Sequence, residues 1–221
     1  RAVLEHADNS SQSVGVSPTD YTALYRYVRK YKPSYVLECG TGKSTVVIAQ
    51  AMLENLDGGS PERIRLVSME HDPNWYEQAV SVLPDQFKDF VEICHSPVDS
   101  YQYSFVRGAV YKDVPDYPYQ FVFVDGPPQG FEGESTMCDM DFVRVVEKSD
   151  TPVSAFVDNR KHTVLAYSLI FGQGKVAWHQ EWNLGRVDGV TRRDMLLADK
   201  NLMRKSVFAS DAVRKVSEAP F

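Results

Sequence analysis

The sequence is poor in cysteine and has no long apolar stretch. Its three cysteines, Cys39, Cys94 and Cys138, form no close pair and no zinc-like cluster, so we expect a reducing compartment, the cytoplasm. No run of about 18 apolar residues occurs, and no apolar core follows positive charge near the N-terminus. We therefore expect neither a membrane span nor a signal peptide, although a leader removed ahead of Arg1 would leave no trace.

An excess of positive charge is also absent. The 221 residues include 24 Lys and Arg against 30 Asp and Glu, which gives a formal net charge of -6. A chain of this balance is poorly suited to neutralise the phosphates of a duplex or to lie on an anionic membrane. We expect no nucleic-acid partner and no membrane partner. The 43% hydrophobic and 24% charged residues are an ordinary globular composition, and the length suits one domain.

Apolar strands alternate with helical stripes along most of the chain. Helices are predicted at 17–31, 44–56, 74–83, 139–147 and 161–171, and strands at 35–39, 64–69, 90–94, 121–124 and 153–157. This alternation predicts an α/β fold with a doubly wound parallel sheet, covered by helices on both faces. After Gly174, the segments 176–182 and 191–197 predict two strands without a helix between them, and hence an antiparallel C-terminal pair.

The domain boundaries follow from the same patterns. Residues 1–16 are polar and aperiodic, and we interpret them as an N-terminal arm. Residues 17–198 carry the alternation and form the predicted domain. Residues 199–221 are a C-terminal tail, which is either part of that domain or an oligomer contact.

Residues 38–45 read ECGTGKST, and the last letters resemble the phosphate loop of nucleotide hydrolases and kinases. That loop has the pattern G-x-x-x-x-G-K-[ST], and its first glycine would fall at Leu37, inside the predicted strand. The turn is therefore too short to surround a triphosphate. Because Asp125 follows an apolar strand, as does the magnesium-holding acid of such enzymes, a nucleotide hydrolase or kinase stays the alternative.

The same stretch also fits the pattern E-x-G-x-G-x-S. Glu38 lies at the strand end, and Gly40 and Gly42 clear space for a ligand across the backbone, at the carboxyl ends of parallel strands. A second acid, Glu70, ends the next strand in SMEHDP. An acid at this position can accept hydrogen bonds from the two hydroxyls of a ribose. The two segments together predict a ligand that contains a nucleoside.

At these residues the sequence resembles the class I S-adenosylmethionine-dependent methyltransferases. VLECGTGKST at 36–45 is similar to their first motif and SMEHDP at 68–73 to their second. A dinucleotide-binding dehydrogenase would instead have a third glycine where Thr45 stands. The resemblance covers roughly residues 17–198 and implies a Rossmann-like, seven-stranded, mostly parallel sheet with an antiparallel C-terminal pair.

The resemblance also implies a donor site. It places Glu38 and Gly40 near the methionine part of S-adenosylmethionine, Gly42 beneath the sugar and Glu70 on the ribose hydroxyls. His71 and Ser96 are then expected at the adenine. The full set of implied donor-binding residues is Glu38, Gly40, Thr41, Gly42, Ser44, Glu70, His71, Ser96 and Asp125.

Methyl transfer needs an aligned acceptor and, for a hydroxyl, a base that removes its proton. Asp125 follows one predicted strand and Asp158 and Asn159 follow another, so all three side chains could converge at one sheet edge. Their oxygens suit Mg²⁺ or another divalent cation. This placement resembles the cation-dependent O-methyltransferases related to catechol and caffeoyl-coenzyme A O-methyltransferase.

The sequence departs from those enzymes at the base. They commonly have a lysine shortly after the first aspartate, whereas GPPQ follows Asp125 here. Lys161 or His162 could substitute, or both could simply belong to the first turn of the next helix. A metal-free site that uses Asp125 or a histidine as the base is therefore equally open.

Two segments could shape the choice of acceptor. Residues 101–119 are rich in aromatic side chains and could form an acceptor wall or lid, or pack against a second subunit in a homodimer. Residues 130–134 form a glycine-containing loop that could act as a gate. The expected function is methyl transfer from S-adenosylmethionine to a small acceptor, most simply a hydroxyl oxygen. The alternative outside enzymology is a donor-binding partner subunit that has lost catalysis.

Overall fold

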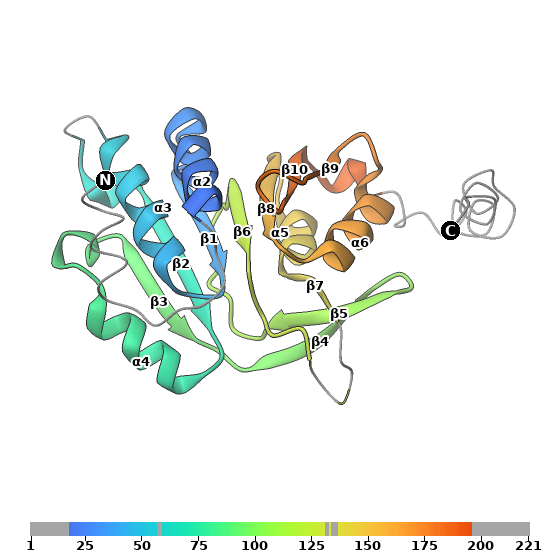
Figure 1. Ribbon diagram of the computed structural model, residues 1–221, viewed down its shortest axis with the longest axis horizontal. Coiled ribbons are helices and arrows are strands. Elements are labelled where there is room, and N and C mark those ends of the chain that lie inside the picture. Colours follow the sequence, from blue (N-terminus) through green and yellow to red (C-terminus); the bar gives the residue numbers. More distant parts are fainter. Residues whose placement is uncertain (1–17, 57–58, 131–132, 134–136, 196–221) are drawn as a thin grey trace, which may run out of the picture.

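The computed structural model describes residues 18–56, 59–130, 133 and 137–195. The N-terminal arm at 1–16 and the tail at 199–221 lie outside these residues. One sheet of seven strands dominates the fold, in the order β3-β2-β1-β6-β8-β10-β9 (Figure 1). Its strands are β1 (Tyr35–Cys39), β2 (Arg65–Glu70), β3 (Val91–His95), β6 (Phe121–Val124), β8 (Val153–Asp158), β9 (Val176–His179) and β10 (Leu184–Val190).

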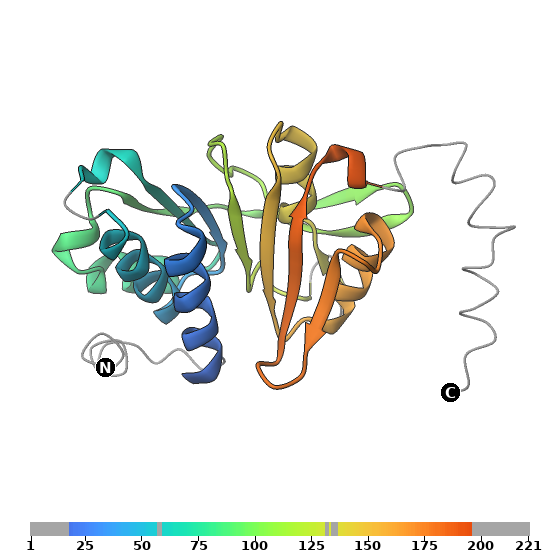
Figure 2. The same ribbon diagram turned by 90° about the horizontal axis from the view of Figure 1, so that it is seen from above.

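The sheet confirms the predicted doubly wound topology. Every pair from β3 to β8 is parallel, and the β8–β10 and β10–β9 pairs are antiparallel. The helices are α2 (Pro18–Tyr31), α3 (Lys43–Glu54), α4 (Pro73–Val82), α5 (Asp141–Lys148) and α6 (Lys161–Phe171). Short 3₁₀ turns lie at Pro61–Arg63, Asp85–Phe87 and Arg192–Asp194. Figure 2 shows the sheet spanning the molecule from β3 to the β9–β10 hairpin.

Successive residues of the central strands pack on opposite faces of the sheet. Val36 belongs to a core cluster with side chains of α2 and α3, whereas Leu37 belongs to one with side chains of α5 and α6. Both side chains are fully buried. The strands are therefore covered on both faces, which explains their continuous apolar sequences. No helix within the described residues is long and apolar enough to cross a membrane.

The second strand of the C-terminal hairpin was predicted at 191–197, and this is wrong. It is β10, at Leu184–Val190, and Thr191 instead caps the 3₁₀ turn at Arg192–Asp194. Two glycines in β10 hide the strand pattern. At Gly185 a Cβ atom would lie 2.2 Å from Cγ2 of Val164, so the glycine permits α6 to pack directly on β10.

A second, three-stranded sheet overlaps the region at 101–119 that was expected to form an aromatic insertion. It has the order β4-β5-β7, with β4 at Val98–Tyr103, β5 at Val106–Tyr111 and β7 at Cys138–Asp139. β4 and β5 form an antiparallel hairpin, and β7 pairs parallel with β5. Gly108 permits this last pairing, because a Cβ atom there would lie 2.1 Å from the carbonyl oxygen of Cys138. Part of the expected insertion is thus regular sheet.

Candidate functional site

The acids predicted at the strand ends lie in one row along an edge of the main sheet. Cys39 pairs with Met69 and with Val124, and Val124 pairs with Val157. The next residue of each strand or turn is Gly40, Glu70, Asp125 and Asp158, respectively. Parallel register therefore places these four positions side by side at the carboxyl edge, where doubly wound sheets bind their ligands.

Glu38 is a buried carboxylate with one free oxygen. Its side chain is fully buried, and its Oε2 accepts hydrogen bonds from the hydroxyls of Thr45 at 2.5 Å and Ser68 at 2.6 Å. Its Oε1 has no hydrogen-bond partner among the described residues. Burial raises the pKa of Glu38 to about 7, although the hydroxyls of Ser44, Ser68 and Thr45 oppose the shift. A buried acceptor without a partner is costly, so this atom is suited to receive a donor group from a ligand.

The turn after β1 is tightly packed on one side and open on the other. Gly40 has φ +95°, and a Cβ atom there would lie 2.8 Å from the carbonyl oxygen of Asp125. A Cβ atom on Gly42, in contrast, would meet no atom of the described residues within 4 Å. The Thr41 hydroxyl lies 3.2 Å from that of Thr45, which also accepts the N–H of Gly42 at 3.1 Å. The space beside Gly42 is therefore open, whereas the space beside Gly40 is filled by the turn after β6.

The same turn excludes a phosphate loop. Leu37 stands where that loop needs its first glycine, and it is a fully buried residue within β1. Ser44, which a phosphate loop would direct at magnesium, is almost completely buried in the first turn of α3. The Gly-Lys-Ser-Thr ending is therefore a chance match.

Glu70 is on β2, next to the strand of Glu38, and its carboxylate accepts hydrogen bonds from the backbone of the turn that follows β2. Its Oε1 accepts the backbone N–H groups of His71 at 2.7 Å and Asp72 at 2.9 Å, and it lies 3.0 Å from Nδ1 of His71. Oε2 takes no part in these three contacts. The amides thus orient the carboxylate while leaving an acceptor oxygen for a hydroxyl pair.

Ser96 is fully buried and joins the two sheets. Its hydroxyl accepts the N–H of Asp113 at 2.9 Å and lies 3.2 Å from the carbonyl oxygen of Pro97. Its own backbone N–H donates to the carbonyl oxygen of Glu70 at 2.8 Å. The contact places Ser96 beside the ribose-binding candidate. Its predicted role at the adenine, and that of His71, stay predictions.

The sequence patterns did not single out Arg160, the buried cation of this edge. Its Nη1 donates to the carbonyl oxygen of Pro127 at 2.8 Å and lies 3.1 Å from Oδ1 of Asp139. Its Nη2 donates to the carbonyl oxygen of Asp125 at 2.5 Å and lies 3.5 Å from Oδ1 of Asp125. Only its position directly after Asp158 and Asn159, at the start of a helix, could have drawn attention to it.

Two aspartates, Asp125 and Asp139, contact this guanidinium, and a third, Asp158, lies within the range of its charge. Burial raises the pKa of Asp125 to about 6 and that of Asp139 to about 7, and Arg160 opposes both shifts. Burial also raises the pKa of Asp158 to about 7, with Asp125 and Asp20 adding to the shift. Desolvation alone would lower the pKa of Arg160, but Asp139 and Asp125 outweigh it and raise the pKa.

Of the other predicted catalytic and metal-binding residues, Asp158 lies beside Asp125, whereas Asn159, Lys161 and His162 have contacts elsewhere. Asn159 is exposed, has φ +42°, and donates its backbone N–H to the carbonyl oxygen of Asn183. Lys161 is exposed, and its Nζ lies 5.2 Å from the ring centre of Trp178. His162 places Nε2 2.9 Å from the carbonyl oxygen of Met137. No three His, Cys, Asp or Glu side chains among the described residues form a group that could hold a metal ion.

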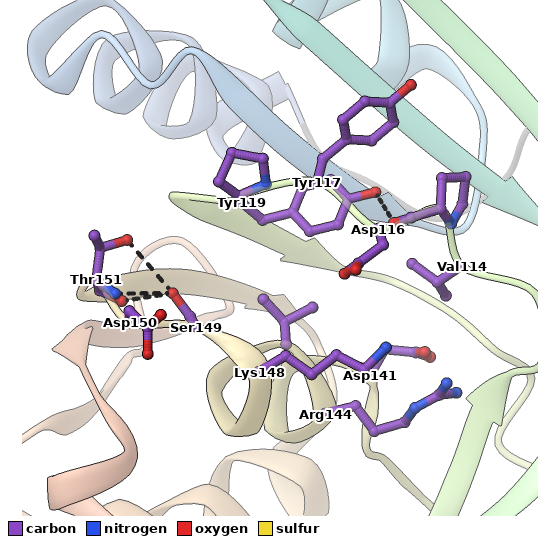
Figure 3. A pocket seen from close by; sticks show the side chains of 13 residues that line it. Val114, Asp116, Tyr117, Tyr119, Asp141, Arg144, Lys148, Ser149, Asp150 and Thr151 are labelled. Atoms are coloured by element: carbon purple, nitrogen blue, oxygen red, sulfur yellow. Dashed lines mark hydrogen bonds between the residues drawn. The ribbon is translucent and has the colours of Figure 1, made fainter.

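Two described cavities lie away from this edge. One, of about 330 Å³, lies between residues 114–119 on one side and α5 with residues 149–151 on the other (Figure 3). Residues 114–119 precede β6, so this cavity is at the amino-terminal end of that strand. The other, of about 560 Å³, lies between α2 and the C-terminal hairpin. Neither is lined by any of Glu38, Gly40, Glu70, Asp125 or Asp158.

Comparison with known proteins gives one family match and several structural matches. A family model described as "Methyltransferase domain" matches residues 37–162. The O-methyltransferase TomG from Streptomyces achromogenes, solved with SAM, is 18% identical over 86% of this chain and 90% of its own, with a TM-score of 0.54. The O-methyltransferase from Bacillus cereus, solved with SAH, is 19% identical over 85% and 89%, with a TM-score of 0.52.

A methyltransferase from Geobacter sulfurreducens is 15% identical over 86% of this chain and 90% of its own, with a TM-score of 0.55. At such identities these structures demonstrate a shared fold. No curated protein matches the chain in sequence.

Proposed function

The chain belongs to the methyltransferase-domain family, and we propose that it transfers a methyl group from S-adenosylmethionine to a hydroxyl oxygen of a small acceptor. The observation that carries the proposal is the free Oε1 of buried Glu38, whose other carboxylate oxygen is linked through the Thr45 hydroxyl to the N–H of Gly42. A carboxylate there suits the ammonium group of the donor. Structural relatives named as O-methyltransferases, solved with SAM or SAH, support both the donor and the acceptor atom.

Glu38 and the acids at the carboxyl edge of the sheet have different roles in this proposal. Glu38 holds the amino-acid end of the donor, and Glu70 accepts hydrogen bonds from its ribose. When bound, the donor supplies an electrophilic methyl carbon. The acceptor oxygen forms a bond to that carbon, the carbon–sulfur bond breaks with its electron pair on sulfur, and the hydroxyl proton passes to a carboxylate. Asp125 serves as this base, because its side chain is 33% exposed at the edge while Asp158 beside it is buried.

The charge of the chain bears on one class of acceptor. A net charge of -6 disfavours a nucleic-acid acceptor and is compatible with a small molecule. The three free cysteines are compatible with a reducing compartment, so the cytoplasmic location is retained as part of the proposal. The homodimer stays a prediction.

Calorimetric titration tests donor binding. We expect S-adenosylhomocysteine to bind and ATP with Mg²⁺ to give no heat. Glu70→Gln should weaken S-adenosylhomocysteine about tenfold or more, because the uncharged amide is a poorer acceptor for the ribose hydroxyls. Glu92→Gln is the matched control, since Glu92 lies within β3, away from the carboxyl edge.

Tight magnesium-dependent binding of ATP, without binding of S-adenosylhomocysteine, would overturn the proposal in favour of a nucleotide hydrolase or kinase. If the donor product binds, a methyl-transfer screen across phenols, sugars and small acids identifies the acceptor class. Binding without transfer to any hydroxyl in such a screen, with the fold intact, would instead favour the non-catalytic partner subunit.

A further inference from the structure

The acids at the ends of β6 and β8 already have a cation among them. Asp125, Asp158 and Asn159 formed the predicted divalent-metal set, yet the guanidinium of Arg160 contacts Asp125 through both its backbone carbonyl and its carboxylate. We propose that Arg160, and no divalent ion, is the cation of this site, and that it is the positioning residue that holds Asp125 for proton removal. This inference deepens the proposed function and rests on it.

The contacts of Arg160 are those of a clamp on the turn after β6. Its two terminal nitrogens donate to the carbonyl oxygens of Asp125 and Pro127, so the guanidinium holds this turn by its backbone. The planar fork of arginine is suited to such paired contacts, which a lysine ammonium cannot reproduce. The side chain of Arg160 is 10% exposed, so water competes little for these donors.

Asp139 holds the clamp from the other side. Its carboxylate lies 3.1 Å from Nη1 of Arg160, and its Oδ2 also accepts the Thr163 hydroxyl at 2.9 Å. The hydroxyl of Tyr167 donates to the Asp139 carbonyl oxygen at 2.7 Å. Arg160 therefore links β6 to β7 and α6, and its position is determined by buried contacts rather than by an exposed ion pair.

The contacts of Arg160 also extend to the turn after β1, where S-adenosylmethionine is proposed to bind. The carbonyl oxygen of Asp125, which accepts from Arg160, is the atom that a Cβ on Gly40 would approach to 2.8 Å. Movement of the turn after β6 would thus displace the turn after β1. Arg160 consequently positions the base, Asp125, relative to the turn after β1. A fixed relative position of base and methyl donor is the geometric requirement of an in-line displacement.

A divalent ion does not fit the same residues. Asn159, needed as the third oxygen ligand, is exposed and adopts a left-handed backbone conformation. The Asp125 carboxylate, needed as the first ligand, lies 3.5 Å from a nitrogen of Arg160. A dication there would experience the repulsion of a buried positive charge, and Asp158 alone would remain as an unshared carboxylate ligand.

The test begins with the wild-type protein. Chelation with EDTA should leave methyl transfer unchanged, and titration of MgCl₂ or MnCl₂ into the donor-free protein should give no specific heat and no rise in Tm. Because these last measurements need neither donor nor acceptor, they decide the metal question even if the proposed function fails. Loss of activity on chelation, restored by Mg²⁺, or a saturable metal titration abolished by Asp158→Asn, would overturn the inference.

Variants of Arg160 test the positioning role. Arg160→Ala leaves Asp125, Asp139 and Asp158 without a cation, so we expect kcat to fall about a hundredfold and Mn²⁺ to raise the Tm of the variant. Guanidinium chloride at about 20 mM, far below denaturing concentrations, should restore part of kcat. Arg160→Lys should keep the charge but lose the paired contacts. Because the lysine side chain still occupies the site, the same guanidinium should rescue this variant less.

Arg144→Ala is the matched control. Arg144 also donates to a backbone carbonyl, that of Tyr111, but it is on α5 and not at the carboxyl edge of the main sheet. It should gain neither a Mn²⁺-dependent Tm nor rescue by guanidinium. Equal rescue of both alanine variants, or full kcat in a folded Arg160→Ala, would contradict the positioning role. If Arg160→Ala does not fold, Arg160→Lys and the wild-type metal titrations still decide.

Discussion

At the scale of single residues, Glu38 combines a binding role with a cost to the fold. Its folded-state pKa of about 7 is above the ordinary carboxyl value because the side chain is buried. A raised carboxyl pKa means that the unfolded chain releases its proton first as the pH rises. Stability is then fully present at low pH, falls between the unfolded and folded pKa values, and is constant above about pH 7.

Glu38→Gln removes this cost together with the charge that the donor needs. At pH 8 we expect the variant to be more stable than the wild type by up to about 3 kcal/mol, and the gain to vanish near pH 4. S-Adenosylhomocysteine should bind at least about tenfold more weakly. Urea unfolding at both pH values and calorimetry check the two effects.

Glu54→Gln gives a control of opposite sign. The hydroxyl of Tyr25 lowers the pKa of Glu54, so its contribution to stability is present at neutral pH and lost in acid. This variant should therefore be less stable than the wild type at pH 8 and equal to it in acid. A Glu38→Gln variant that loses stability at pH 8 would show that the buried carboxylate is stabilising after all.

The sequence predicts some residues of the site and not others for a physical reason. Glu38, Gly40 and Glu70 lie where short backbone motifs place them, because each is at or next to the end of a strand. Arg160 cannot be found this way, since a long side chain reaches across to the turn after β6 and to Asp139. The exposed, left-handed backbone of Asn159 is likewise a product of the turn into α6 and of its contact with Asn183.

At the scale of elements, the turn between β1 and α3 contains two glycines that we expect to be required for different reasons: Gly40 for the fold and Gly42 for ligand binding. Gly40→Ala should destabilise the protein by about 2–4 kcal/mol, because a positive φ and the nearby Asp125 carbonyl oxygen both oppose a Cβ atom. Gly42→Ala should change stability by less than about 1 kcal/mol, since the backbone is extended and the space beside it is open. It should nevertheless weaken S-adenosylhomocysteine about tenfold or more, because the methyl group occupies ligand space.

Gly133→Ala is the control for backbone strain alone. Gly133 has φ +84°, and no atom of the residues that the structure describes lies within 4 Å of a Cβ there, so we expect a loss of only about 1 kcal/mol. Thermal unfolding and calorimetry distinguish the three variants. Unchanged donor affinity in a folded Gly42→Ala variant would place the ligand elsewhere.

The strands and helices of the main sheet are predictable because period and turn signals agree over most of its length. The β4–β5 hairpin is not, because its turn at Ser104, with φ +57°, uses no glycine or proline. The aromatic residues around that turn favoured a lid instead. β10 was displaced in the prediction because Gly185 is required by the packing of α6, a tertiary contact that overrides strand propensity.

At the scale of the whole molecule, the two core clusters run the length of the same sheet. The cluster beneath α5 and α6 includes Val67 of β2 as well as Val190 of β10. The cluster beneath α2 and α3 includes Leu66 of β2 as well as Leu184 of β10. Neither end of the sheet has a core of its own, so the ends should not unfold independently.

The three tryptophans make this cooperativity measurable, because Trp75 lies on α4 at one end of the sheet and Trp178 and Trp182 lie at the C-terminal hairpin. We expect the Trp75→Phe variant and the Trp178→Phe/Trp182→Phe double variant each to give the same urea midpoint by fluorescence as by circular dichroism. S-Adenosylhomocysteine, for which we propose a site in the middle of the sheet edge, should raise the midpoints at both ends equally. Two results would contradict this expectation: a fluorescence midpoint that differs from the circular dichroism midpoint of the same variant, or a ligand shift confined to the Trp75 end. Either would mean that the strands β1 and β6 do not couple the unfolding of the α4 end of the sheet to that of the C-terminal hairpin. In that case the contacts of Arg160 between the turn after β6 and α6 could not hold the two ends of the sheet in a fixed relative position. This measurement therefore also tests the proposed role of Arg160.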